Sequence, residues 1–327
     1  MWLVIETGLD LLCAVKHIPP EKVINQGNFF HEAQMLKKAE HPNIIKVYDT
    51  GVLSDGRIYV SMEYLPKGSL EDETKGGFVK LSRAKEVMID VLRGLEHAHL
   101  KEIVHRDIKP ANILIGKHGE GVLSDFGLAL PDIKTINLAS LKTYQYLLHL
   151  APEVNDFHEQ TVLSDIYACG ITLYRLVNGD IYLPKVSPSD ARLLAKRGKF
   201  PDRNKYREFV PRQLKLVINK ATNLEPAKRF QSACEMRRAL EQISIQTDWE
   251  ETKLSTGYRW RGKKGDLHFE IMRSISPQNG MITVATRKGK IITKLSKVNS
   301  LSKEFFSNDQ AITFCKQVLQ QITVGSK

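Results

Sequence analysis

A lysine, several carboxylates and an asparagine stand at spacings that could serve chemistry on phosphate. Lys16 lies in the strand-like stretch CAVK, where its ammonium could contact a phosphate group. Acidic, basic and amide side chains recur in HRDIKPANILI, residues 105–115, and in SDFGLA, residues 124–129. A glycine-rich loop is expected just before a lysine of this kind, yet Gly8 is the only glycine upstream of Lys16. The chain therefore carries groups for phosphate chemistry without the loop that would cover the phosphates.

These motifs are followed by APE, residues 151–153, and SDIYACG, residues 164–170. In this order and spacing they resemble the eukaryotic-type (Hanks-type) serine/threonine protein kinase family. A lone D-F-G arises by chance, but about eight specified residues in the right order do not. The resemblance covers about residues 1–243. It implies an α+β, bilobal kinase fold, with a small β-rich N-lobe that lacks its first strand and a larger helical C-lobe.

The resemblance assigns catalytic roles in phosphoryl transfer from ATP to a protein hydroxyl. Lys16 would contact the α- and β-phosphates, and Glu32 would hold its ammonium in place. Asp107 would accept or orient the proton of the substrate hydroxyl, and Lys109 would stabilise the γ-phosphate. Taken alone, Lys16 and Glu32 would be an unrelated strand lysine and a solvated helix glutamate. Their occurrence with the other motifs favours the catalytic interpretation.

The resemblance also implies ATP and Mg²⁺ as cofactors. Asn112 and Asp125 would bind the metal through oxygen atoms, because Mg²⁺ is a hard cation. The adenine would lie between apolar side chains and beside the segment that connects the two lobes. The residues expected around ATP, besides Lys16, Asn112 and Asp125, are Ala14, Met62, Glu63, Leu65 and Leu114.

Other matching residues are expected to support the site rather than contact substrate. Asp165 would anchor the catalytic loop from a buried helix. Glu153 would form a buried ion pair with Arg229 in EPAKRF. The rings of His105 and Phe126 would stack inside the core.

The segment before APE departs from the family pattern. Gln145 and Tyr146 occupy the positions where the family usually has Gly-Thr, which affects the expectation for peptide docking. Arg106, next to Asp107, implies control by phosphorylation, because an arginine can pair with a phosphate and order the loop. The candidate phosphorylation sites are Thr135, Ser140, Thr143 and Tyr144, with Thr143 favoured.

The composition is that of a soluble globular protein. Of the 327 residues, 42% are hydrophobic and 26% charged, and no apolar run is long enough to span a bilayer. The four cysteines stand singly, without a C-x-x-C pair, which favours a reducing compartment over a disulfide framework. The sequence therefore predicts a cytoplasmic protein.

The pattern of elements predicts a kinase domain over residues 1–246 and a further small domain over 247–327. The N-lobe would cover about residues 1–64 and the C-lobe about 65–246. The C-terminal domain has a β-β-β-α pattern and holds 14 Lys/Arg against 7 Asp/Glu, within a net charge of +11 for the chain. Its cations, with Tyr258 and Trp260, could meet a nucleic acid or a regulatory protein.

The leading hypothesis is an ATP- and Mg²⁺-dependent protein serine/threonine kinase. A pseudokinase is the alternative: a scaffold that binds nucleotide weakly and acts through protein contacts. A third hypothesis makes the C-terminal domain a nucleic-acid sensor that regulates the kinase. The glycine-rich loop and the first strand would lie just before Met1 and are expected to be missing from this chain. Either a real deletion or a shortened gene would explain their loss. ATP binding by the chain as written is therefore expected to be weakened.

Overall fold

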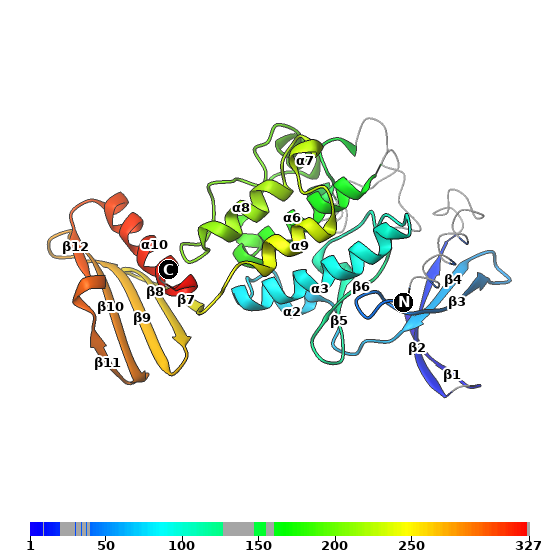
Figure 1. Ribbon diagram of the computed structural model, residues 1–327, viewed down its shortest axis with the longest axis horizontal. Helices are drawn as coiled ribbons and strands as arrows, with labels where there is room; N and C mark the ends of the chain where they lie inside the picture. The colour runs from blue at the N-terminus through cyan, green and yellow to red at the C-terminus, as the bar shows by residue number, and fades with distance from the viewer. Residues whose placement is uncertain are drawn as a thin grey trace. The chain divides into compact units, whose positions relative to one another are not determined.

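The computed structural model describes residues 1–8, 10–19, 30, 34, 37, 40–126, 147–154 and 160–325 (Figure 1). They form two compact units. The first comprises Met1–Val79, Ala84–Lys205 and Val217–Glu241. The second comprises Lys80–Arg83, Tyr206–Leu216 and Gln242–Lys327. The domain boundary predicted between residues 246 and 247 stays a prediction.

The N-terminal part of the first unit is an antiparallel four-stranded sheet in the order β1-β2-β4-β3. Its strands are β1 (Trp2–Glu6), β2 (Leu11–Ile18), β3 (Val47–Val52) and β4 (Ile58–Glu63). Alternate residues of β4 are buried, as expected for a strand with one face on a core. The β-rich N-lobe predicted from the sequence is confirmed.

Helices dominate the rest of the first unit, which confirms the predicted helical C-lobe. The central one is α6 (Val162–Asn178), which is buried over nearly its whole length. Thr161 and Ser164 form a capping box at its start, and Gly179 ends it with φ of 78°. The other elements are α2 (Leu70–Thr74), η2 (Pro110–Asn112), β5 (Ile113–Ile115), β6 (Gly121–Leu123), η4 (Asp180–Tyr182), α7 (Pro188–Lys196), η5 (Pro226–Lys228) and α9 (Ala233–Glu241).

Two helices contribute residues to both units: α3 (Leu81–Leu100) and α8 (Arg212–Ala221). Ser82 lies in the first turn of α3, which begins at Leu81. Ser82 donates from its backbone N–H and its hydroxyl to the Asp248 carboxylate, within the second unit. None of the helices in the described part of the chain is long and apolar enough to cross a membrane.

The buried ion pair predicted from APE is confirmed. Arg229 donates to both carboxylate oxygens of Glu153 at 2.7 Å. The Arg229 side chain is fully buried, and its remaining donors reach the carbonyls of Asn223, Leu163 and Leu224. Every N–H of the guanidinium group therefore has an acceptor, as a buried charge requires.

The second unit is a twisted antiparallel sheet with one helix. Five strands follow the order β11-β10-β9-β8-β7, and β12 also pairs with β10. The helix packs against β9, β10 and β12 (Figure 1). The elements are β7 (Asp248–Leu254), β8 (Gly257–Lys264), β9 (Leu267–Ile275), β10 (Ile282–Ile291), β11 (Lys294–Lys297), η6 (Asn299–Leu301), β12 (Lys303–Phe305) and α10 (Asn308–Val324).

The β-β-β-α prediction for this unit has the right kind of elements but too few strands. Residues 248–264 form two strands around a turn, and the stretch after Met281 folds into the β10–β11 hairpin. The two tryptophans of this unit belong to the core rather than to a binding surface. Trp249 is 2% exposed and donates to Thr323 of α10, and Trp260 is fully buried and donates to Glu251.

We expect Arg229→Ala to destabilise the first unit strongly. The substitution leaves the half-buried Glu153 and three carbonyl groups without their donor, which typically costs about 3–5 kcal/mol. The thermal midpoint should fall by about 6–20 °C in a calorimetric or fluorescence melt. Lys228→Ala is the matched control, because Lys228 pairs with Glu225 at the surface and surface pairs contribute little. Equal midpoints for the two variants would refute the prediction.

Candidate active site

Lys16 and Asp125, far apart in the sequence, form an ion pair. Lys16 lies on β2, opposite Val60 of β4, and Asp125 follows β6. The Lys16 Nζ and Asp125 Oδ1 atoms are 2.9 Å apart, and both side chains are partly exposed. The fold thus brings the predicted phosphate-contacting lysine next to a predicted metal ligand, where both can reach a ligand from solvent.

The second group of candidate residues comes from a single loop that ends in η2. Lys109 Nζ contacts both carboxylate oxygens of Asp107, at 2.8 and 2.7 Å. Asn112 Nδ2 donates to the Asp107 carbonyl at 2.8 Å and to its Oδ2 at 2.7 Å. The short helix closes the loop through a bond from Asn112 N to the Lys109 carbonyl. The local backbone therefore gathers the acid, the cation and the amide around the Asp107 carboxylate.

A buried carboxylate on α6 holds this loop in place. Asp165 is 1% exposed. Its Oδ2 accepts from the His105 backbone N–H at 2.8 Å, and its Oδ1 accepts from the Arg106 backbone N–H at 2.9 Å. The His99 ring lies 2.9 Å from the same Oδ2. This confirms the prediction that Asp165 anchors the loop.

His105 is a fully buried, neutral part of the same support. Its Nε2 lies 3.0 Å from the Ser124 carbonyl, and its Nδ1 accepts from the Asp107 backbone N–H at 3.3 Å. Burial lowers the pKa of His105, because desolvation disfavours the charged ring. Its ring lies 4.4 Å from the Phe126 ring, centroid to centroid, at an interplanar angle of 39°, so the predicted contact is present with the rings tilted rather than stacked. The histidine thus links the catalytic loop to the segment that carries Asp125.

Two residues of the site have backbone conformations that residues other than glycine rarely adopt. Arg106 has φ of 71° and Asp125 has φ of 53°. Such conformations cost on the order of 1–3 kcal/mol and persist where surrounding contacts fix them. For Arg106 the bond from its N–H to Asp165 supplies one such contact. Arg106 directly precedes Asp107, and Asp125 is itself a predicted metal ligand, so both strained positions lie at groups that the sequence assigns to chemistry.

An apolar cluster lies next to these polar groups. Ala14 and Met62 face each other on neighbouring strands β2 and β4. Both belong to a buried cluster against which Leu65 and Leu114 pack. Four of the five residues predicted around adenine therefore lie in one apolar environment, which suits a flat, largely apolar ring.

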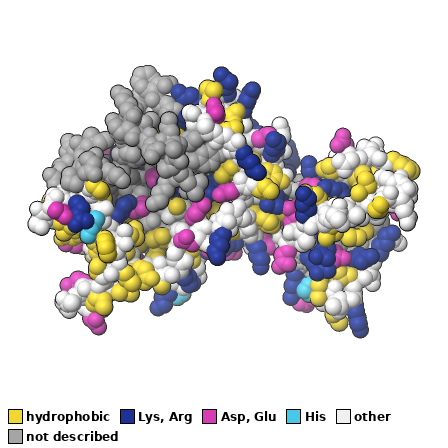
Figure 2. All heavy atoms as spheres, turned by 180° about the vertical axis from the view of Figure 1, so that it is seen from behind, with side chains coloured by type: hydrophobic (Ala, Val, Ile, Leu, Met, Phe, Trp, Pro, Cys, Tyr) yellow, Lys and Arg dark blue, Asp and Glu magenta, His cyan; other side chains and the backbone are white. Residues whose placement is uncertain are grey.

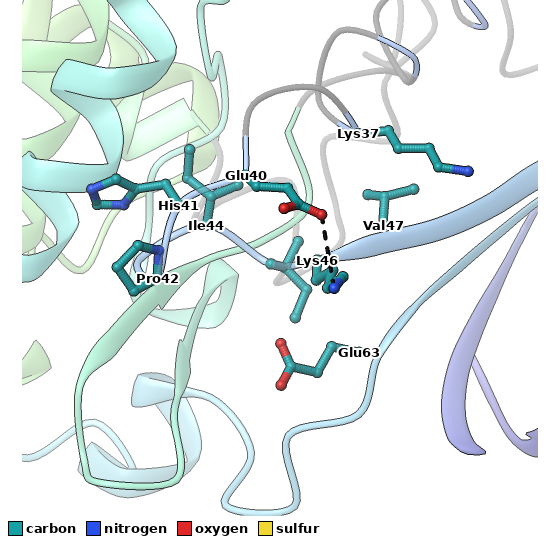
Figure 3. Close-up of a pocket in the computed structure, with 9 residues that line it drawn as sticks. Lys37, Glu40, His41, Pro42, Ile44, Lys46, Val47 and Glu63 are labelled. Carbon is teal, nitrogen blue, oxygen red and sulfur yellow. Dashed lines mark ion pairs between the residues drawn. The ribbon is translucent and has the colours of Figure 1, made fainter. Parts of the chain in front are cut away.

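Glu63, the fifth residue, presents its side chain elsewhere. It lines a cavity of about 320 Å³ together with the loop that precedes β3 (Figure 3). The cavity includes His41 and Lys46, and Lys46 pairs with Glu40 at 3.7 Å. The backbone N–H of Glu63 donates to the Lys46 carbonyl. A contact of Glu63 with adenine would have to use its backbone carbonyl rather than its carboxylate.

The donor set fits ATP and Mg²⁺. Asn112 uses its amide nitrogen on Asp107, so its oxygen faces away from that bond, and no described residue donates to it. Asp125 uses Oδ1 on Lys16, which leaves its second oxygen for a cation. Amide and carboxylate oxygens are the ligands that Mg²⁺ prefers. Lys16 supplies a cation for phosphate, and the apolar cluster supplies a surface for the base.

Several predicted residues lie outside the described parts of the chain. Glu32 is one of them, so its pairing with Lys16 stays a prediction. Gln145 and Tyr146 are also outside, as are the candidate phosphorylation sites Thr135, Ser140, Thr143 and Tyr144.

The structure adds supporting residues that sequence reasoning missed. Arg192 of α7 is 7% exposed and donates to the carbonyls of Leu150, Ala151 and Pro152, so it fixes the APE segment. Arg175 of α6 is 3% exposed and pairs with Asp180 and with Glu71 of α2. An arginine within an apolar helical face is the one signal that could have revealed them.

Comparisons with known proteins agree with this geometry. The protein kinase domain family matches residues 3–241. The serine/threonine-protein kinase PrkC of Bacillus subtilis is 32% identical over 237 residues, 69% of this chain and 36% of the relative. PknB of Mycolicibacterium smegmatis is 33% identical over 222 residues, 65% of this chain and 35% of the relative. PknJ of Mycobacterium tuberculosis is 29% identical over the same length.

The chain spans about a third of the length of these curated relatives. All three are named serine/threonine-protein kinases. The match covers the four-stranded sheet, the catalytic loop and the helices of the first unit. The chain therefore belongs to the protein kinase family.

Proposed function

We propose that the protein transfers the γ-phosphate of ATP to a serine or threonine hydroxyl of a protein substrate. The observation that carries this proposal is the arrangement around Asp107, where Lys109 and Asn112 both contact one partly exposed carboxylate. The Lys16–Asp125 pair belongs to the same unit. Phosphoryl transfer needs positioned charges rather than covalent catalysis, and these residues are of the required types.

The proposed roles follow from the contacts of each side chain. Asp107 accepts or orients the hydroxyl proton, because its partly exposed carboxylate is the proton acceptor within the catalytic loop. The Lys109 ammonium contacts Asp107 in this structure and could also contact a phosphate bound beside Asp107. Lys16 binds the α- and β-phosphates, with Glu32 as its further partner. Mg²⁺, when bound to Asn112 and Asp125, would neutralise charge that develops on the phosphates.

The pseudokinase alternative is favoured by one local observation. Gly8 belongs to the turn between β1 and β2, where its N–H donates to Glu6 Oε1 at 3.1 Å. It is therefore a hairpin glycine and not part of a phosphate-binding loop. The activity tests below separate the enzyme from the scaffold.

We also propose a cytoplasmic location. The support is chemical: Cys13, Cys169, Cys234 and Cys315 are all free thiols. Burial raises the pKa of the Cys169 and Cys315 thiols, so they are poor nucleophiles and unsuited to exchange chemistry. Unpaired cysteines fit a reducing compartment.

For the C-terminal domain we propose a regulatory partner, for which the sequence left a protein and a nucleic acid open. The nucleic-acid hypothesis loses one of its supports, because Trp260 is buried and stacks with Tyr258 inside the unit. Bases would find no exposed tryptophan on β8 on which to stack. The basic charge of the domain remains and points to a partner with negative charge.

Asp125→Ala tests the enzyme claim directly. Loss of the carboxylate removes a metal ligand and frees the Lys16 ammonium, so transfer of labelled phosphate should fall by about 10²–10³-fold. The assay uses the full chain with labelled ATP, Mg²⁺ and a generic protein substrate. Asp202→Ala is the control, because Asp202 pairs with Lys205 at the surface. Equal incorporation in wild type and Asp125→Ala would leave the scaffold as the better account.

Asp165→Asn tests the support of the catalytic loop. An amide nitrogen would face a backbone N–H where an oxygen now accepts, so the loop should shift. A displacement of about 1 Å can cost about 10²-fold in rate, and we expect a loss of this size in kcat with little change in KM for ATP. A melting curve of the variant establishes that it is folded at the assay temperature. A rise in KM with unchanged kcat would contradict the positioning role.

A further inference from the structure

The β10–β11 hairpin carries the densest group of cations in the second unit. Residues 287–297, here called the basic tip, read RKGKIITKLSK and contain no acidic residue. Its lysines have no ion-pair partner among the described residues. The one arginine, Arg287, lies 3.7 Å from Glu270. The cations of the basic tip are Arg287, Lys288, Lys290, Lys294 and Lys297.

Two isoleucines occupy the end of the basic tip. Ile291 is 55% exposed and Ile292 is 39% exposed. Ile291 pairs with Lys294 across the turn, so the apolar pair is flanked by lysines on both strands. Gly289 permits this shape, because a Cβ atom there would lie 2.5 Å from the Lys294 carbonyl oxygen. The hairpin therefore exposes two large apolar side chains to solvent next to the lysines of the basic tip.

A second turn reaches the same end of the sheet. The β8–β9 hairpin turns at residues 265–266, and Gly289 pairs with His268 near the start of β9. Ile292, Lys263 and His268 line one cavity of about 490 Å³, together with Lys80 and Arg261. Two acids line this cavity, and one of them, Asp248, accepts a hydrogen bond from the Ser82 backbone N–H. The other is the exposed Glu250.

The open face of the sheet contrasts with this end. One row of paired residues runs across it in the order Glu250, Arg261, Glu270, Arg287, Lys297. Charges of opposite sign alternate along most of the row, and Arg261 and Arg287 both pair with Glu270. Arg287 and Lys297, at the base of the basic tip, belong to this row, so the cations of the tip that lie outside it are Lys288, Lys290 and Lys294. Figure 2 shows yellow and dark-blue side chains next to each other at the lower end of this unit.

We propose that the basic tip binds the surface of a membrane that contains anionic lipids. Lysines attract such a surface from solution, and apolar side chains enter the boundary between headgroups and acyl chains. Ile291 and Ile292 would insert, while Lys288, Lys290 and Lys294 would contact headgroups around them. A nucleic acid would use the lysines but offers no comparable place for two exposed isoleucines. The proposal goes beyond phosphoryl transfer and does not depend on it.

Co-sedimentation of the full chain with lipid vesicles tests the proposal. The protein should bind vesicles of phosphatidylcholine and phosphatidylserine, and should bind pure phosphatidylcholine weakly. Lys290→Gln/Lys294→Gln should lower the partition coefficient by about 25-fold, at roughly fivefold per lysine. Ile291→Ser/Ile292→Ser should lower it by at least about tenfold, without any change in charge. Melting curves check that each variant stays folded.

The matched controls lie at the other end of the sheet. Lys253→Gln/Lys303→Gln removes the same charge about 20 Å away, roughly two Debye lengths at about 0.1 M salt. Ile275→Ser removes an isoleucine that is 48% exposed. Both should bind like wild type. Absence of binding to anionic vesicles, or equal losses in tip and control variants, would overturn the proposal. Tighter binding to a single-stranded oligonucleotide that needs the lysines but not the isoleucines would replace the membrane with nucleic acid.

Discussion

The catalytic loop depends on one buried carboxylate, that of Asp165. The charge is held by three donors, two of them backbone N–H groups of consecutive loop residues. A buried charge of this kind is stable only when its lone pairs are satisfied, so the loop and the carboxylate fix each other. The fixed loop then keeps Arg106 at positive φ, and the Asp107 carboxylate projects toward Lys109 and Asn112. Removal of the carboxylate would release all of these constraints together.

Hydrogen bonds connect this anchor, through neutral and buried groups, to the charged and accessible groups of the site. The His105 ring contacts the Ser124 carbonyl, and Ser124 N and Oγ both donate to the Asn112 carbonyl. Asp125, the next residue, meets Lys16 from the sheet. The inner groups are fully buried and fix geometry, whereas the outer groups keep a quarter or more of their surface exposed and can exchange partners. A site that binds a highly charged nucleotide needs accessible charged groups on a fixed support. The support lowers the entropy cost of ordering these groups when the nucleotide binds.

The sequence could predict those parts of the site in which residue type alone nearly determines the role. Asp107, Lys109 and Asn112 lie within six residues, so their proximity follows from local backbone structure. Lys16 and Asp125 were assigned to one site only by family resemblance, and their ion pair was not predicted, since no periodicity links positions in different strands. Arg192 and Arg175 escaped prediction because their acceptors are backbone carbonyls or acids distant in sequence. The additional strand β11 was not predicted because the turn at Ile292 and Thr293 carries no Gly or Pro signal.

The second unit shows why a charge count is a poor guide to a binding surface. The sequence gives the C-terminal region twice as many cations as acids, which by itself favours any anionic partner. Strand register then decides where the excess lies. Pairing places Arg261 and Arg287 on either side of Glu270, so those cations are neutralised on the open face. In the described part of the chain the lysines of the β10–β11 turn form no ion pair, and the same turn exposes Ile291 and Ile292. Charge and apolar surface therefore coincide at one end of the sheet, and this coincidence, rather than the net charge, restricts the class of partner.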